Sequence, residues 1–285
     1  MSLDSRLRIR TRNALHLLNL QTCDAGVSPT RWQKSLHPAG YHRKLAVIHE
    51  GIDTQLIAPN PEQAFTLPNG TVLTKQDEVI TYVARNLEPY RGFHQFMRAV
   101  PQICARRPKA HILIVGGDDV SYGARTPDGK TWREHMLGEV SVDPSRVHFL
   151  GRLPYAYYLR LLQVSSAHVY LTVPFVLSWS MLEAMSAGCL VVGSNTAPVQ
   201  EVIEHGKNGL LVDFFSPGEI AEAVTQVLDH PDRMQALRDA ARQTIIERYE
   251  VRQSLRAYGN LIGALLTGKK MAGRTNVAGL RGGMA

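Results

Sequence analysis

Short apolar runs alternate with amphipathic stretches from residue 44 onward. The runs are rich in β-branched residues and are bounded by glycine, proline or polar residues, which is typical of buried strands. The stretches between them have the spacing of helices. The predicted strands cover residues 44–49, 78–84, 110–117, 146–151, 168–173, 190–194 and 209–214. The predicted helices cover residues 92–107, 131–140, 155–165, 178–187 and 198–205, followed by helices between Pro217 and Leu266.

This alternation predicts an α/β fold, a Rossmann-like doubly wound parallel sheet with further helices at the C-terminal end. Strands that are apolar throughout need helices on both faces of their sheet. Such sheets bind ligands at the carboxyl ends of their strands. One irregularity is expected within this pattern. Pro101 should kink or split the helix over residues 92–107, because proline lacks a backbone N–H.

The positive charge of the chain is concentrated at its two ends. The net charge is +7, yet residues 45–268 carry 20 bases and 23 acids. Residues 1–44 hold eight Lys or Arg and two Asp, and residues 269–285 hold four Lys or Arg and no acid. A nucleic-acid-binding domain should carry its own basic patch, so no nucleic-acid partner is expected. The basic ends are either solvated or in peripheral contact with an anionic membrane face.

Other bulk features favour a cytoplasmic protein. The three cysteines, Cys23, Cys104 and Cys189, are far apart and form no CxxC pair, so neither a zinc site nor a disulfide framework is indicated. Arginines near the start interrupt any apolar secretory signal. The uncharged span from Val169 to Leu182 contains Pro174 and is shorter than the roughly 20 residues that a membrane span needs. The expected location is therefore the cytoplasm, with the inner face of a membrane as an alternative site of contact.

Two common nucleotide-binding motifs do not fit. The turn after the strand 78–84 reads ARNLEPYRGF, with arginines where a dinucleotide fold has the glycines of GxGxxG. The stretch GARTPDGKT (123–131) ends like a P-loop, but five residues separate its glycines where the motif has four. A cradle of backbone N–H groups does not easily tolerate that change. This stretch is predicted to be a surface loop.

Arg85 and Arg91 are candidate anion-binding residues. Arg85 is predicted at the carboxyl end of a strand, and Arg91 at the start of the following helix, so both should project to one rim of the sheet. Two guanidiniums placed there could bind a diphosphate in a bidentate manner. The alternative is a pair of structural salt bridges near Glu88. Spacing alone leaves both interpretations open.

The stretch PFVLSWSMLEAMSAGCLVV (174–192) contains a single charged residue, Glu183. Ser178 is a candidate N-cap for the helix 178–187, whose first-turn N–H groups would attract an anion. Two interpretations of Glu183 follow from the helical period. It either lies on a solvated helix face, or it enters the ligand cleft and accepts hydrogen bonds from ligand hydroxyls, as acids do from ribose.

Four segments, in order along the chain, resemble the C-terminal, donor-binding half of a GT-B glycosyltransferase of the retaining class called family 4 or group 1. The resemblance covers about residues 45–266. Each segment alone is weak, but four in register are specific. The segments are VIHEGID (47–53), YVARNLEPYRGF (82–93), RVHFLGRLP (146–154) and LEAMSAGCLVVGSNTAPVQEVIEHGKNGLLVD (182–213).

The resemblance implies a role for each candidate residue. Arg85 and Arg91 would bind the diphosphate of a nucleotide sugar and stabilise the leaving group as charge develops. Glu183 would hold the ribose hydroxyls. The other implied substrate-binding residues are Ser178, Trp179 and Ser180 for the phosphates, and Gly151, Arg152 and Leu153 for the base. No metal or other cofactor is implied, because the cations come from side chains.

The chain departs from the family pattern in one important position. The family has a second acid eight residues before the one that binds ribose, where it contacts the donor sugar. Phe175 occupies this position here. It is therefore the candidate residue for an altered sugar subsite. Glu50 also stands where the family usually has Asn, with less obvious consequences.

Length is the other departure, because only about 45 residues precede the donor-binding segment. The predicted organisation is a remnant of an N-terminal domain with a linker (1–44), a nucleotide-sugar-binding domain (45–268) and a disordered basic tail (269–285). Apolar surface on the C-terminal helices should then be left for a separate acceptor-binding domain or for self-association. Three functions remain open: the donor half of a glycosyltransferase with weak or no transfer on its own, a noncatalytic nucleotide-sugar-binding subunit, and a nucleotide-sugar epimerase of the same fold.

Overall fold

The computed structural model describes residues 2–268, and the chain divides into two compact units. The larger unit is Ile52–Glu250. The smaller one combines the two ends of the chain, Met1–Gly51 and Val251–Ala285. This division groups the last helix with the N-terminal segment, whereas the sequence pattern suggested a boundary after residue 44. The predicted basic tail lies outside the described residues.

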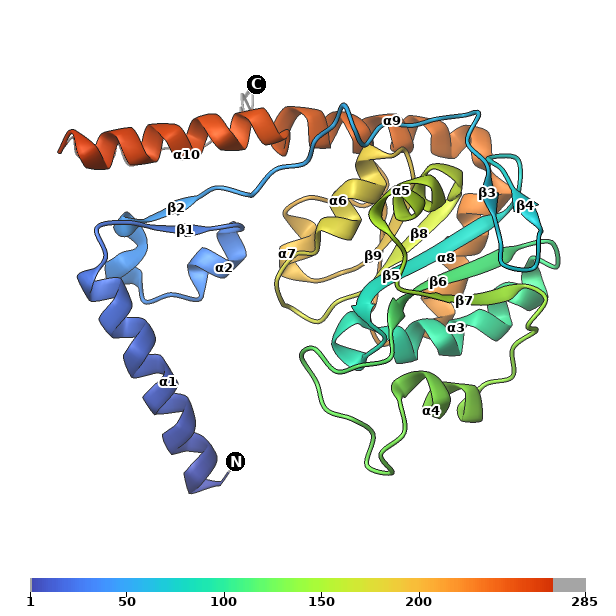
Figure 1. Ribbon diagram of the computed structural model, residues 1–285, viewed down its shortest axis with the longest axis horizontal. Coiled ribbons are helices and arrows are strands. Elements are labelled where there is room, and N and C mark those ends of the chain that lie inside the picture. The colour runs from blue at the N-terminus through green and yellow to red at the C-terminus, as the bar shows by residue number, and fades with distance from the viewer. Residues whose placement is uncertain (1, 269–285) are drawn as a thin grey trace, which may run out of the picture. The chain divides into compact units, whose positions relative to one another are not determined.

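A six-stranded parallel sheet forms the centre of the larger unit, as the alternating pattern predicts (Figure 1). The strand order is β10-β9-β8-β5-β6-β7, and every neighbouring pair is parallel. The order reverses between β5 and β8, which is where open α/β sheets usually form a ligand crevice. The strands are β5 (Val79–Asn86), β6 (His111–Gly117), β7 (Val147–Gly151), β8 (Ala167–Tyr170), β9 (Leu190–Ser194) and β10 (Leu210–Val212).

Helices cover both faces of this sheet, so each face has its own hydrophobic core (Figure 1). One core contains Tyr82 of β5 and Phe96 of α3, whose rings stack at a centroid distance of 5.0 Å. The other contains Val191 of β9 and Leu182 of α6. Each such buried side chain contributes about 1.5–3 kcal/mol. The helices are α3 (Phe93–Arg106), α4 (Trp132–Glu139), α5 (Tyr155–Val164), α6 (Trp179–Ser186), α7 (Ala197–Gln200), α8 (Pro217–Asp229) and α9 (Pro231–Arg248).

Pro101 does not split its helix, which was one of the two effects expected of this proline. Helix α3 continues through Pro101 from Phe93 to Arg106. A proline removes one backbone hydrogen bond, but the buried face of α3 packs along its whole length, and this packing dominates helix stability in a folded protein. The helix begins after Gly92, which has φ of 70° and whose hypothetical Cβ would lie 2.3 Å from the Cβ of Leu171. Only glycine fits this turn.

Several local elements differ from the sequence pattern. The strand predicted over residues 44–49 does not join the six-stranded sheet: β2 (Leu45–Val47) pairs in parallel with β1 (Gly26–Ser28) in the smaller unit. A short hairpin of β3 (Phe65–Thr66) and β4 (Val72–Leu73) was not predicted. The stretch 123–131 is a loop, as expected, and its last residue, Thr131, caps α4.

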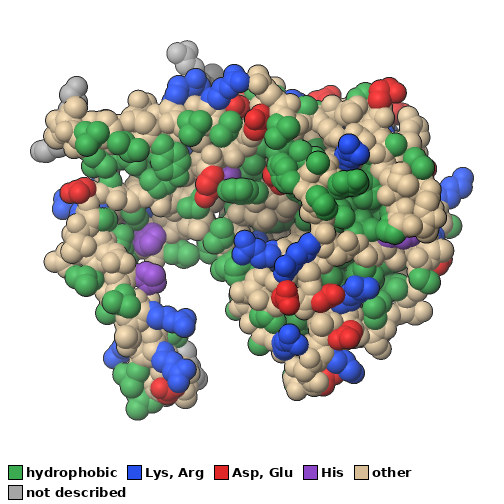
Figure 2. Space-filling model, in the orientation of Figure 1, with side chains coloured by type: hydrophobic (Ala, Val, Ile, Leu, Met, Phe, Trp, Pro, Cys, Tyr) green, Lys and Arg blue, Asp and Glu red, His purple; other side chains and the backbone are tan. Residues whose placement is uncertain are grey.

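The smaller unit carries exposed apolar side chains on two of its helices, α1 (Leu3–Thr22) and α10 (Val251–Leu266). Figure 2 shows hydrophobic side chains on the surface of both. Over residues 2–268, neither of these helices nor any other combines the length and the apolar character needed to span a membrane. The unit also contains α2 (Arg31–Ser35) and the 3₁₀ helix Ala39–Lys44. The exposed large apolar residues of the two long helices are Leu3, Leu7, Ile9, Leu15, Leu17 and Leu18 on α1, and Leu255, Ile262, Leu265 and Leu266 on α10.

A buried histidine should make the stability of the larger unit depend on pH. His168 of β8 is fully buried, and its Nδ1 lies 2.9 Å from Oγ1 of Thr81. Burial lowers the pKa of His168 to about 3 from its ordinary 6.5. Below pH 6.5 the unfolded state therefore binds a proton that the folded state excludes. Stability is complete above pH 6.5 and falls as the pH falls toward 3.

We expect this histidine alone to remove about 2 kcal/mol of unfolding free energy between pH 6.5 and pH 5, since each unit of pH corresponds to about 1.4 kcal/mol. Urea denaturation at several pH values measures the loss. The variant His168→Asn should have a shallower pH dependence, whatever its stability at pH 7. An unchanged slope would show that other groups cause the acid sensitivity.

Candidate functional site

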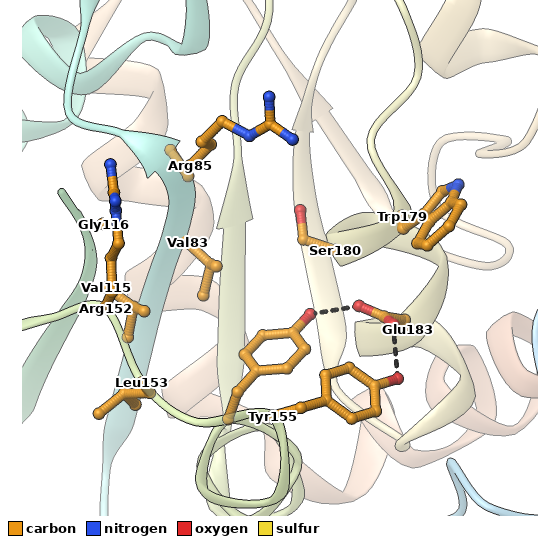
Figure 3. Close-up of a pocket in the computed structure, with 12 residues that line it drawn as sticks. Val83, Arg85, Val115, Gly116, Arg152, Leu153, Tyr155, Trp179, Ser180 and Glu183 are labelled. Atoms are coloured by element: carbon orange, nitrogen blue, oxygen red, sulfur yellow. Dashed lines mark hydrogen bonds between the residues drawn. The ribbon is translucent and has the colours of Figure 1, made fainter. Parts of the chain in front are cut away.

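A cavity of about 730 Å³ opens at the carboxyl ends of the central strands (Figure 3). Strands β5 and β6, the loop after β7, and the first turns of α5 and α6 contribute its walls. This is the position that the parallel sheet predicts for a ligand site. The lining residues are Val83, Ala84, Arg85, Val115, Gly116, Arg152, Leu153, Tyr155, Tyr158, Trp179, Ser180 and Glu183.

Glu183 is held rigidly on one wall of the cavity. Its side chain is only 6% exposed, so the interpretation as a solvated helix face is wrong. The hydroxyl of Tyr155 donates to Oε1 at 2.8 Å, and the hydroxyl of Tyr158 donates to Oε2 at 2.7 Å (Figure 3). Burial and the nearby carboxylate raise the pKa of both tyrosines, so both stay protonated donors at neutral pH. An ionised carboxylate has about four acceptor positions, so two remain for a ligand.

Two arginines give the cavity its positive charge. Arg85 is exposed at the end of β5, and no hydrogen bond or ion pair engages its side chain within residues 2–268. The Nη2 group of Arg152 donates to Oδ1 of Asn86 and to Oδ2 of Asp119, both at 3.0 Å. Arg152 lies on the opposite side of the cavity from Glu183 (Figure 3). Of these two cations, Arg85 is therefore the one with no protein partner in the described part of the chain.

Close packing at the end of β6 depends on glycine. A Cβ on Gly117 would lie 2.6 Å from Oδ1 of Asn86 and 2.7 Å from Nε of Arg152. A side chain at this position would displace the contact between Asn86 and Arg152. Gly117 thus permits the contact between Asn86 and Arg152 beside the cavity, although the run AHILIVGG does not form a GxGxxG motif.

Arg91 is committed to contacts within the protein. Its Nη1 group donates to the hydroxyls of Tyr170 and Thr172 at 3.1 Å each. It also donates to the carbonyl of Val176 at 3.0 Å. Arg91 does not line the cavity that contains Arg85. The structure therefore does not bring the two arginines together in one described cavity, and Arg91 orders the loop before α6.

Phe175 belongs to an aromatic cluster above Arg91. The guanidinium carbon of Arg91 lies 5.3 Å from the centre of the Phe175 ring and 5.6 Å from that of Tyr122, which are cation–π distances. The rings of Phe175 and Tyr122 meet edge to face at 4.9 Å. Tyr90 contacts Phe175 from another side, at 6.0 Å. An apolar cluster thus stands where the resemblance implies an acid.

Glu88 does not form the salt bridges considered from the sequence. This carboxylate is buried and accepts hydrogen bonds from the backbone N–H groups of Tyr122 and Gly123, at 3.1 and 2.9 Å. Among the described residues it forms no ion pair with Arg85 or Arg91. Its function is to fix the loop after β6 against the turn before α3.

The cavity contains six of the ten residues predicted for the site: Arg85, Arg152, Leu153, Trp179, Ser180 and Glu183. The other four, Arg91, Gly151, Phe175 and Ser178, are not among its lining residues. Ser178 is nevertheless the N-cap of α6, as predicted. The sequence pattern missed Tyr155 and Tyr158, although two tyrosines three residues apart at the start of a helix share a face. No cluster of metal-ligand residues occurs between positions 2 and 268.

Comparison with known families agrees with this architecture. Residues 66–244 match the family of glycosyl transferases group 1. Residues 1–57 match a second family, described as glycosyl transferase family 4 group. A doubly wound parallel sheet with a cavity at its carboxyl edge is a common architecture of α/β proteins. Within that class, the chain belongs to the group 1 glycosyl transferases.

Curated relatives are longer than this chain. A D-inositol 3-phosphate glycosyltransferase of Corynebacterium glutamicum is 28% identical over 65% of this chain and 44% of its own length. A GDP-mannose-dependent alpha-(1-6)-phosphatidylinositol monomannoside mannosyltransferase of Mycobacterium tuberculosis is 24% identical over 77% of this chain and 55% of its own length. The chain therefore spans about half the length of these relatives.

Solved structures share the fold. Sucrose-phosphate synthase from Thermosynechococcus elongatus superposes with a TM-score of 0.72 at 19% identity, covering 91% of this chain and 62% of that protein. Anabaena HepE in complex with UDP-glucose also has a TM-score of 0.72, at 17% identity, covering 92% of this chain and 68% of that protein. At sequence identities this low, the similarity establishes the fold alone. The ligand has to be inferred from the residues of the site.

Proposed function

We propose that this chain is the donor-binding part of a glycosyltransferase that takes its sugar from a nucleoside-diphosphate sugar. The observation that carries the proposal is the cavity in which Arg85 faces solvent and Glu183 is held by two tyrosine hydroxyls. A cation and a fixed carboxylate suit the diphosphate and the ribose of one nucleotide. By resemblance, the transfer retains the anomeric configuration and uses no metal.

The individual roles follow from placement. Arg85 would bind the diphosphate and stabilise the negative charge of the leaving nucleotide. The first turn of α6, from Ser178 to Ser180, would meet the phosphates, mainly through the backbone N–H of Trp179, because the N–H groups of Ser178 and Ser180 already donate to the hydroxyls of Tyr170 and Ser178. The loop from Gly151 to Leu153 would contact the base. Arg91 would act mainly by fixing the loop that carries Phe175. The resemblance additionally implies a direct contact between Arg91 and the diphosphate.

A noncatalytic nucleotide-sugar-binding subunit is the second candidate, and Phe175 favours it. The family acid at this position contacts the donor sugar, and a phenyl ring cannot replace its hydrogen bonds. The exposed leucines of α1 and α10 would then be covered by a separate acceptor-binding domain or by a second copy. Adding such a domain in trans separates the candidates, because restored sugar transfer indicates an enzyme and persistent inactivity indicates a binding subunit.

Isothermal titration calorimetry with UDP, GDP and ADP tests the proposal directly. We expect one of the three to bind with a dissociation constant on the order of micromolar to millimolar, because the cavity offers one unpartnered arginine and one carboxylate as charged contacts. One relative depends on GDP-mannose and one similar structure holds UDP-glucose, so both bases are tested first. Binding should persist in EDTA. The absence of binding by all three nucleotides would overturn the proposal.

A further inference from the structure

A second cavity, of about 280 Å³, lies in the larger unit and shares no lining residue with the first. Its walls come from the C-terminal ends of α5 and α6, from α9, and from the segments around Pro59 and Lys75. The first turns of α5 and α6 line the donor cavity, so these two helices separate the two sites. The second cavity is therefore near the amino ends of the strands.

Three cationic side chains line this second cavity: Lys75, Arg238 and Arg242. The Nζ group of Lys75 donates to the carbonyl of Ser165 at 2.6 Å. Arg238 is 7% exposed, and its Nη2 group donates to the carbonyl of Ser166 at 3.1 Å. Such bonds orient the cations but leave their charge without an anionic partner.

The guanidinium of Arg242 is oriented in the same way. Its Nη1 group donates to the carbonyls of Ile57 and Ser186, and its Nη2 group donates to the carbonyl of Thr54 at 3.1 Å. Ser186 is the last residue of α6, where exposed carbonyls favour a cation. The neutral carbonyl partners thus hold three positive charges around one small cavity.

These charges form no ion pair with a carboxylate in the part of the chain that the structure describes. Within residues 2–268, none of the three cations lies within 4.0 Å of an acidic oxygen. Asp239 is the one acid that lines the described cavity, and it accepts a hydrogen bond from Gln235 at 2.8 Å. Burial raises the pKa of Cys189, so this neighbouring thiol is neutral at pH 7. Three cations therefore face one carboxylate.

Burial makes the charged form of these three side chains less favourable. It lowers the pKa of Lys75, of Arg238 and of Arg242. The Nε group of Arg238 is also fully buried and has no acceptor among the described residues. Buried cations and unpaired N–H groups both destabilise a folded protein, and an anion in the cavity would relieve the first of these two costs.

We propose that this cavity binds a phosphate group. Guanidinium groups match the geometry of phosphate oxygens, and lysine adds a compact positive charge. A volume of about 280 Å³ is at the lower limit for small-molecule sites, which suits inorganic phosphate or a small phosphate monoester. Gln163, Gln235 and Asn60 supply further polar groups around the walls.

Calorimetry with potassium phosphate, in chloride buffer of matched ionic strength, tests this site on the full chain. We expect phosphate to bind and to raise the melting temperature. Lys75→Met should weaken phosphate binding at least about tenfold, because it removes one charged hydrogen bond. Asp239→Asn changes an exposed residue and should strengthen binding about threefold, since it removes the repelling charge. A parallel titration with glycerol 3-phosphate shows whether an ester is preferred to free phosphate.

Arg85→Ala distinguishes this site from the donor cavity. Phosphate binding should be unchanged in Arg85→Ala, while nucleotide binding is weakened by about 10- to 100-fold. The reverse pattern, with phosphate binding lost in Arg85→Ala and retained in Lys75→Met, would overturn the proposal. The proposal would also be overturned if phosphate and chloride stabilised the protein equally and Asp239→Asn did not change phosphate binding. If Lys75→Met does not fold, two other variants still test the phosphate site. Asp239→Asn should strengthen phosphate binding. Asn60→Asp adds a negative charge and should weaken it.

Discussion

Arg85→Ala should weaken binding of the preferred nucleoside diphosphate by about 10- to 100-fold. A hydrogen bond between two charged groups contributes about 1.5–3 kcal/mol, and Arg85 is the cation that faces the donor cavity without a protein partner among residues 2–268. For the same reason, the stability of the free protein should hardly change. Calorimetry measures the affinity, and urea denaturation measures the stability.

Two other arginines serve as controls for this result. Arg106 is exposed at the far end of α3, so Arg106→Ala removes the same charge without touching the site. Nucleotide affinity should stay within a factor of about two. Arg91→Ala should instead lower the unfolding free energy by about 2 kcal/mol, because three hydrogen bonds from its guanidinium are lost. Equal affinity losses in Arg85→Ala and Arg106→Ala would show a general charge effect and no direct contact.

The strands and the position of the site could be predicted because they depend on local patterns. Runs such as EVITYVA and AHILIVGG are apolar throughout, and only a sheet covered on both faces buries them. The carboxyl edge then follows from parallel topology, which is why Arg85 was predicted correctly at the end of its strand. The N-cap at Ser178 could also be predicted, because capping depends only on the residue and the next few positions of the helix.

The environment of Glu183 could not be predicted because it depends on packing between helices. The helical period alone permitted a solvated face, and only the contact of α6 with α5 buries the carboxylate against Tyr155 and Tyr158. Arg91 is a similar case: its spacing from Arg85 suggested a shared rim, but its partners come from β8 and the following loop. Pro101 is a case in which a local rule fails. Proline is expected to split or kink a helix, but tertiary packing keeps α3 continuous through this residue.

Glu183→Gln should also reduce nucleotide affinity by about 10- to 100-fold. The amide has nearly the same shape as the carboxylate but lacks the charge that strengthens hydrogen bonds from ribose hydroxyls. Glu183 lines the cavity and accepts one bond from each tyrosine, so its carboxylate keeps further acceptor positions. The 2′-deoxy form of the preferred nucleotide reports on this contact. The wild-type protein should bind the ribonucleotide more tightly than the deoxynucleotide.

The ratio of these two affinities identifies the role of the carboxylate. If Glu183 holds the ribose, the preference for the ribonucleotide should nearly disappear in Glu183→Gln. Tyr158→Phe is the matched control: it removes one phenol that positions Glu183 but keeps the negative charge. Affinity should then fall only about threefold, and the preference should remain, because a lost positioning bond is weaker than a lost charge. Should Glu183→Gln weaken both nucleotides equally, the carboxylate only anchors the tyrosines of α5, and the ribose-binding group must be sought elsewhere in the cavity.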